Sequence, residues 1–192
     1  MARYWWVIVL VIIGLFAASG VNTIPTLDEQ VKASWAEVQN QYQRRMDLIP
    51  NLVETVKGYA NFEQKTLTDV IEARADATKV SVSPETLNDP EAFKKFEQVQ
   101  GTLTSALSRL MAVSERYPEL KANQNFLGLQ SQLEGTENRI AVARKDYIAT
   151  VQTYNTTVRT FPGLIWAMIY GAKVKPEFSA VEGADKPPAV KF

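Results

Sequence analysis

The stretch Gln39–Val53, which reads QNQYQRRMDLIPNLV, combines a dense group of amide and charged side chains with an apolar repeat. The apolar residues recur at steps of three and four, the spacing of one helix face. A proline inside a helix loses one backbone hydrogen bond and collides with the preceding turn, but it is tolerated in a first turn. We therefore expect a kink or a tight joint between two helices at Pro50. The apolar face continues across it through Tyr42, Met46, Ile49, Leu52, Val53 and Val56.

Composition excludes several function classes. The 192-residue chain has 21 basic and 21 acidic residues, so it lacks the positive excess typical of nucleic-acid-binding proteins. It has no cysteine and no histidine, which excludes disulfides, thiolate chemistry, the usual zinc ligand sets and a histidine general base. The remaining polar residues form no specific catalytic motif. We predict a non-enzymatic protein without cofactor, metal site or nucleic-acid partner.

The N-terminal segment, residues 1–24, predicts a membrane anchor and a short linker. Tyr4–Val21 is a run of about eighteen residues without charge, long enough to cross a hydrocarbon core of roughly 30 Å. Trp5 and Trp6 lie where an interfacial aromatic belt is expected. A cleaved signal peptide is the alternative, because the small residues Ala17–Gly20 follow the apolar run.

Flanking charges predict the orientation of this anchor. Arg3 and the amino terminus lie on one side, whereas the other side begins with Asp28 and Glu29 and reaches its first cation at Lys32. Because positive flanks stay in the cytoplasm, we expect the bulk of the chain outside it. Translocation of the short N-terminal tail, with the bulk of the chain in the cytoplasm, is the alternative.

Residues 25–160 predict an all-α fold. Apolar residues recur at steps of three and four, close to the heptads of a coiled coil. Four long amphipathic helices with short connections form an elongated up-and-down bundle. Asp89 and Pro90 are typical of a helix cap followed by a first-turn proline. The expected helices cover about residues 26–49, 50–78, 90–117 and 119–160.

Residues 161–192 differ from the bundle in composition. Leu164–Tyr170 is apolar but too short to span a bilayer. Alternating helix directions return it to the membrane, so one interpretation is an interfacial or partner-docking element, with Trp166 and Tyr170 in the aromatic belt. The other is a short helix that closes the open end of the core. From Lys175 onward the composition predicts a flexible tail.

The polar side chains of Gln39–Val53 are candidates for partner recognition. Arg44 and Arg45, next to Asp47, suggest a buried network that fixes helix register. The alternative is a surface ion pair worth less than about 1 kcal/mol. The candidate residues for partner recognition are Asn40, Gln41, Arg44, Arg45, Asp47 and Asn51. With a joint at Pro50, we expect these residues to lie at the membrane-distal turn.

The run from Thr26 to Tyr59, TLDEQVKASWAEVQNQYQRRMDLIPNLVETVKGY, resembles the signature of the LemA family. Tyr154-Asn155-x-x-Val158-Arg159 with Phe161-Pro162, and later Pro176-x-Phe178, are similar to family motifs as well. The resemblance implies a single-pass bacterial membrane protein with a long helical bundle. Many relatives carry a lipoprotein-type cysteine after the apolar segment; this chain has none, which favours a protein anchor.

The resemblance implies where the protein is located in the cell more than it implies a biochemical activity. The family has no established reaction and is associated with the cell envelope and with membrane proteases. We therefore expect a scaffold or adaptor in the bacterial inner membrane that binds envelope proteins, a membrane protease among them, or assembles with itself. The alternative is a membrane-remodelling or pore-related protein that uses the C-terminal apolar segment.

Overall fold

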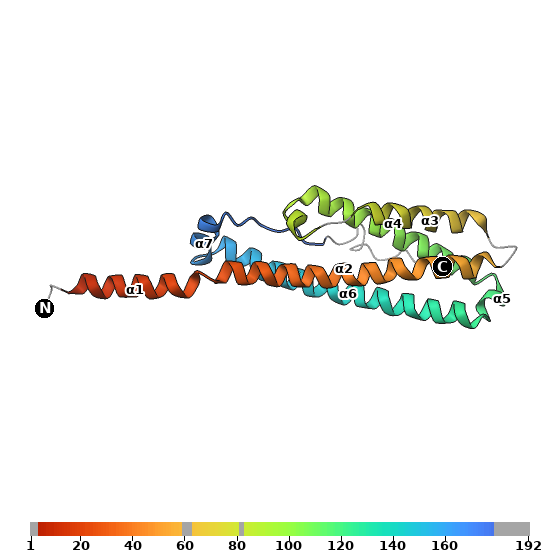
Figure 1. The fold of residues 1–192 in the computed structure, drawn as a ribbon, viewed down its shortest axis with the longest axis horizontal. Helices are drawn as coiled ribbons and strands as arrows, with labels where there is room; N and C mark the ends of the chain where they lie inside the picture. The colour runs from red at the N-terminus through yellow and green to blue at the C-terminus, as the bar shows by residue number, and fades with distance from the viewer. Residues whose placement is uncertain (1–3, 59–62, 81–82, 179–192) are drawn as a thin grey trace, which may run out of the picture.

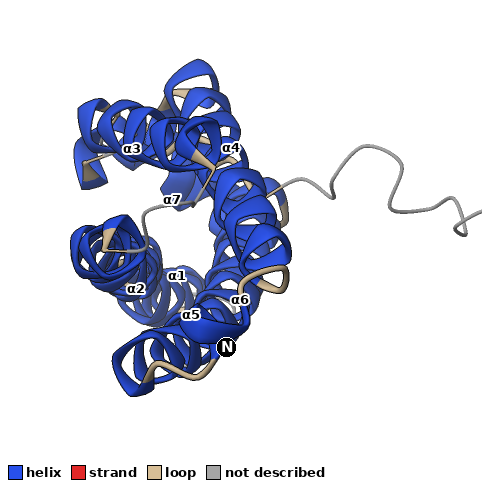
Figure 2. Cartoon of the chain, turned by 90° about the vertical axis from the view of Figure 1, so that its right-hand side faces the viewer, coloured by secondary structure: helices blue, strands red, loops and turns tan. Residues whose placement is uncertain are grey.

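The computed structural model describes residues 4–58, 63–80 and 83–178. Every regular element in these ranges is helical, which confirms the all-α prediction (Figures 1 and 2). The elements are α1 (Trp5–Gly20), α2 (Thr23–Lys57), α3 (Gln64–Lys79), the 3-10 helix η1 (Pro84–Asn88), α4 (Pro90–Ser114), α5 (Pro118–Lys121), α6 (Gln124–Arg159) and α7 (Gly163–Tyr170).

The long helices alternate in direction, as the sequence predicts (Figure 1). We call the end where α2 begins and α6 ends the base, and the end near α5 the distal end. Helix α2 packs along α6, and α3 packs along α4. The α3–α4 pair is shorter and covers only part of the α2–α6 pair (Figure 1). At the base the core is therefore completed by η1, α7 and residues 171–178, which we call the C-terminal strap.

The predicted joint at Pro50 is wrong. Helix α2 continues through Pro50 and ends at Lys57, with Gly58 as its C-cap. Pro50 lies on the exposed face of α2, whereas Ile49 and Leu52 on either side are buried. The same core therefore holds both halves of the helix, and this packing outweighs the lost hydrogen bond. The chain leaves the helix at a glycine instead, where helix propensity is poor.

Helix caps account for other boundaries. Asp89 accepts hydrogen bonds from the backbone N–H groups of Glu91 and Ala92, so the predicted start of α4 is confirmed. The fourth predicted helix does not begin at residue 119, because the short α5 comes first and Asn123 then caps α6. A polar cap that satisfies free N–H groups is a stronger start signal than the apolar repeat alone.

Helix α1 projects away from the bundle at the base (Figure 1). Its side chains from Trp5 to Ile12 are exposed. The helix has 16 residues, and none of the helices in the described ranges is both long and apolar enough to cross a bilayer. A transmembrane anchor is therefore not shown by the structure.

Candidate functional site

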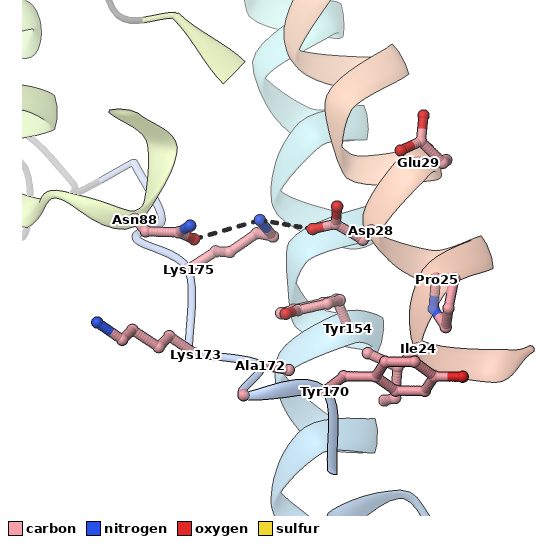
Figure 3. A pocket seen from close by; sticks show the side chains of 11 residues that line it. Ile24, Pro25, Asp28, Glu29, Asn88, Tyr154, Tyr170, Ala172, Lys173 and Lys175 are labelled. Atoms are coloured by element: carbon pink, nitrogen blue, oxygen red, sulfur yellow. Dashed lines mark hydrogen bonds and ion pairs between the residues drawn. The ribbon is translucent and has the colours of Figure 1, made fainter. Parts of the chain in front are cut away.

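A cavity of about 410 Å³ lies at the base, between the first turns of α2, the end of α6 and the C-terminal strap (Figure 3). The strap side chain Lys175 is buried beside it, with 4% of its surface exposed. Its Nζ lies 2.8 Å from Asp28 Oδ1 and donates a hydrogen bond to Asn88 Oδ1 at 3.3 Å. The same Nζ lies 5.1 Å from the centre of the Tyr154 ring. The buried ammonium group is thus held by α2, η1 and α6 together.

Side chains of α6 bind the strap through its backbone. The amide oxygen of Asn155 accepts a hydrogen bond from the Lys175 N–H at 2.9 Å, and the Asn155 Nδ2 donates to the Lys175 carbonyl at 2.9 Å. The Tyr147 hydroxyl donates to the Pro176 carbonyl at 3.1 Å. An extended segment buried among helices lacks ladder partners, so these side chains supply the hydrogen bonds that a neighbouring strand would supply.

The strap ends in an aromatic pocket. Phe178 is buried, with ring centres of Phe93, Tyr147 and Trp35 at 4.9, 5.6 and 6.1 Å from its own. The Arg144 guanidinium lies 4.2 Å over the Phe178 ring. Aromatic pairs at these separations favour tilted and edge-on arrangements, which is what the interplanar angles of 56° and 74° with Phe93 and Tyr147 show.

Electrostatics at the cavity favour a charged Asp28. Burial alone raises the pKa of the Asp28 carboxyl, but hydrogen bonds and charge from Lys175 and Lys32 outweigh it and hold the pKa below its ordinary value. Burial raises the pKa of the Tyr154 hydroxyl, and the Asp28 charge adds to that effect. The site is therefore an ion pair between the buried Lys175 and the partly exposed Asp28, next to the Tyr154 ring.

A second polar group lies halfway along the bundle. Arg45 is 1% exposed, and its Nη1 donates to Thr104 Oγ1 at 2.8 Å and to Glu137 Oε1 at 3.0 Å. Its Nη2 donates to the side-chain oxygen of Gln100, and its guanidinium lies 4.9 Å from the centre of the Tyr42 ring. The predicted buried network therefore forms around Arg45 alone, with partners from α4 and α6. The prediction is wrong for Arg44 and Asp47, which are exposed and outside this network.

The other candidates of Gln39–Val53 lie elsewhere. The stretch is inside α2 and not at the membrane-distal turn, because the joint at Pro50 does not exist. Gln41 is half-buried and donates to Glu37 at 2.6 Å, and Asp47 accepts from Gln43 at 2.8 Å. Asn40, Arg44, Asp47 and Asn51 are exposed on the outer face of α2.

The four membrane-interface candidates are all placed near or beyond the base. Trp5 and Trp6 are exposed on α1. Trp166 on α7 packs so closely against Gly20 that a Cβ there would collide with its indole ring. The Tyr170 hydroxyl donates to the Val21 carbonyl at 2.9 Å. The structure therefore brings α7 against the junction of α1 and α2.

Sequence reasoning missed the strap. A flexible tail was expected from Lys175 onward, and this is wrong for residues 175–178, because α6 binds their backbone and Phe178 enters the core. The rest of that predicted tail, residues 179–192, lies outside the described residues. Two signals were present: an asparagine next to the apolar face of α6, and the Pro176-x-Phe178 motif. Neither indicates by itself that the two segments meet.

Comparison with known proteins identifies relatives of this chain by sequence. A sequence profile of the LemA family matches residues 34–192. The chain is 27% identical to Magnetosome protein MamQ 2 of Paramagnetospirillum magneticum and 26% identical to Magnetosome protein MamQ of Magnetospirillum gryphiswaldense; each match covers 86% of this chain and 67% of the relative. It is 21% identical to Protein LemA of Metamycoplasma hominis, over 73% of this chain and 60% of that protein. Because the profile covers most of the sequence, this chain belongs to the LemA family.

Proposed function

We propose that this chain is a non-enzymatic, membrane-anchored helical scaffold of the bacterial cell envelope. The observation that carries the proposal is the exposed apolar surface of α1, which projects from the base with every side chain from Trp5 to Ile12 exposed. A contiguous apolar surface of this kind marks a contact with membrane or protein, because leaving it in water costs about 25 cal/mol per Å². The occupant that we propose is the lipid bilayer.

Helix α1 is shorter than a bilayer crossing requires, so the proposed insertion needs local adaptation of the membrane. Its 16 residues reach about 24 Å at 1.5 Å each, a few ångströms less than a typical hydrocarbon core. Short apolar helices are accommodated by local bilayer thinning and by interfacial side chains. Trp5 and Trp6 are suited to that interface. We place the bundle outside the cytoplasm, with a cytoplasmic bundle as the alternative.

Membrane extraction and side-specific proteolysis test the anchor and its orientation. We expect the full chain to stay in the membrane fraction after alkaline carbonate treatment, and protease to digest the bundle only from the outer side. Leu10→Arg should release the protein, whereas Val142→Arg, on the exposed surface of α6, should not. Release of the unmodified chain by carbonate would rule out the anchor.

The proposed partner surface is a row of polar residues on α2. Asn40, Arg44, Asp47 and Asn51 are exposed and follow each other at steps of four, three and four, so they share one helix face. We propose that this face binds an envelope protein, with a membrane protease as one candidate, or a second copy of the chain. Exposed charges of this kind affect partner choice and association rate more than stability.

Cross-linking and pull-down from detergent-solubilised membranes test this surface. The variant Arg44→Glu, Asp47→Lys should lose a partner or oligomer that the unmodified chain retains. Lys65→Glu, a charge reversal on the exposed face of α3, is the matched control. Recovery of neither a specific partner nor an oligomer with the unmodified chain would remove the scaffold proposal.

A second candidate function, membrane remodelling through α7, is favoured by one observation. Leu164, Ile165, Met168 and Ile169 are exposed on α7 at the same end as α1. Because the chain has no cysteine, a dye can be attached to Ile169→Cys and, as a control, to Val142→Cys. In vesicles we expect a blue shift only for the dye on α7. Equal spectra at both positions would reject α7 insertion.

A further inference from the structure

The C-terminal strap lies in a groove between η1 and α4 on one side and α2 and α6 on the other. We infer that this groove is a peptide-binding site for an extended Lys-Pro-x-Phe segment, and that it accepts the segment from a second copy of this chain as well as from its own. The strap seen here is then the ligand bound within one chain.

Recognition of the strap has the two parts that peptide-binding sites use. Hydrogen bonds to main-chain atoms position the segment. Asn155 binds the backbone N–H and the backbone carbonyl of Lys175, and Tyr147 binds the Pro176 carbonyl. Side-chain pockets then select residues at the first and fourth positions. Asp28 pairs with the Lys175 ammonium group, and the aromatic pocket takes Phe178.

The residue between these anchors contacts the groove more weakly. Glu177 is exposed and accepts a hydrogen bond from Asn155 Nδ2 at 3.2 Å. Val174, just before the motif, is also exposed. The groove therefore selects Lys and Phe at positions 175 and 178 and tolerates change at position 177. A segment that merely filled space would not show this division.

The connection to α7 allows the strap to leave the groove as a unit. It leaves α7 at Gly171, which has a positive φ of 62° and open space around the position of a Cβ. Two backbone hydrogen bonds join the strap to α7 at this corner. The Gly171 N–H donates to the Met168 carbonyl at 3.3 Å, and the Ala172 N–H donates to the Ala167 carbonyl at 2.8 Å.

Exchange between copies preserves the contacts of Lys175 and Phe178 with the groove. A strap from a neighbouring copy meets the same Asp28, Asn155 and aromatic pocket, so the balance depends on effective concentration. The chain's own strap is favoured in dilute solution, and the neighbour's strap gains as copies crowd together. This inference does not depend on the proposed α1 anchor or on the polar face of α2. The experiments can therefore reject any one of the three proposals without rejecting the others.

Cysteine cross-linking of the full chain tests the exchange. One copy carries Lys173→Cys on the strap, and a second copy with a different tag carries Asn88→Cys; both residues line the basal cavity. With a short bis-maleimide we expect a product between the two copies whose yield rises with protein concentration in detergent. A chain with both substitutions should give the link within one molecule.

Matched controls separate exchange from random collision. Gln30→Cys, an exposed α2 position outside the residues that line the cavity, replaces Asn88→Cys and should give at least tenfold less product. Phe178→Ala in the Lys173→Cys copy should reduce the product by a similar factor, and a synthetic peptide of residues 172–178 should compete with it. The corresponding peptide with Glu177→Gln should compete equally well.

Two results would overturn the inference. Efficient linkage within the doubly substituted chain, without a product between copies at any concentration, would show that the groove takes only its own strap. A product between copies that neither the Phe178→Ala substitution nor the peptide reduces would show association through another surface.

Discussion

The distal and basal halves of the bundle are built differently. The distal core is mainly aliphatic, and α2, α3, α4 and α6 all contribute to it. The basal core contains Trp35, Tyr42, Phe93, Phe96, Tyr147, Tyr154 and Phe178, and it is completed by η1, α7 and the strap. Four regular helices close a core with ordinary aliphatic side chains. Beyond the end of α3, large aromatic groups, two of them from the first turns of α4, and the extended strap complete the core.

The Arg45 network lies at the boundary between the two halves. On α2 it follows Tyr42 of the basal core and precedes Met46 of the distal core. Its partners Gln100 and Glu137 occupy the corresponding levels of α4 and α6. The two terminal nitrogens of the guanidinium keep these partners only in one register, because a shift of either helix moves the partners away. The layer therefore specifies how the two apolar cores are aligned.

The largest expected effect is the loss of the central basal aromatic residue. Trp35→Ala should lower the free energy of unfolding by about 3 to 5 kcal/mol, because Trp35 is fully buried and contacts Phe93, Tyr147 and Phe178. Chemical denaturation measures this loss. Hydrogen exchange should also show a less protected strap, whereas Leu110→Ala in the distal core should leave strap protection unchanged. An unchanged denaturation midpoint for Trp35→Ala would contradict the packing described.

The second-largest loss of stability is expected at Arg45, in the polar layer between the two cores. Arg45→Met should cost about 2 to 3 kcal/mol, because Gln100 then keeps a buried polar group without its cation. Glu137 is 38% exposed in its side chain and can be hydrated, so the full cost of an uncompensated buried charge is not expected. Arg44→Met, its exposed neighbour, should change stability by no more than about 0.5 kcal/mol. Equal effects of the two substitutions in denaturant melts would contradict the assignment.

Asn155 should have a smaller and more local effect. Asn155→Ala leaves the N–H and carbonyl of Lys175 without their partners, which we expect to cost about 1 to 2 kcal/mol. Release of the strap limits this cost, so cleavage by chymotrypsin after Phe178, which is buried in the intact strap, should accelerate while the distal core keeps its protection. Thr153→Ala, on an exposed position of α6, is the control. Identical cleavage rates for the two variants would show that Asn155 does not hold the strap.

The smallest effect is the pH dependence of the ion pair. The pKa of Asp28 is lower in the folded chain than its ordinary value of 3.8. The pair therefore contributes its full stabilisation above that value, and the contribution is lost as the pH falls below it towards the folded-state pKa. Strap proteolysis by an acid-active protease should accelerate over this range. Asp28→Asn should remove the pH-dependent step, and a step that persists in this variant would assign it to another group.

The apolar repeats determine much of this architecture by local rules. Leu27, Trp35, Tyr42 and Ile49 recur at helical spacing, so the helices, their buried faces and their alternating directions follow from neighbours along the chain. Asp89 and Pro90 mark a helix start in the same local way. Charge and amide density pointed to Gln39–Val53, but local pattern alone did not decide which of its polar residues is buried.

Only the tertiary structure decided the features that depend on partners far apart in the sequence. Pro50 stays inside α2 because one core packs against both sides of it, although its intrinsic preference is to break the helix. Arg45 is buried and Arg44 exposed because only Arg45 faces Gln100 and Glu137. The strap has no periodicity of its own, and it is ordered because α6 and α2 supply the hydrogen bonds and charge that Lys175 requires. Helix formation depends on neighbouring residues, whereas the basal core forms only when segments distant in the sequence pack together.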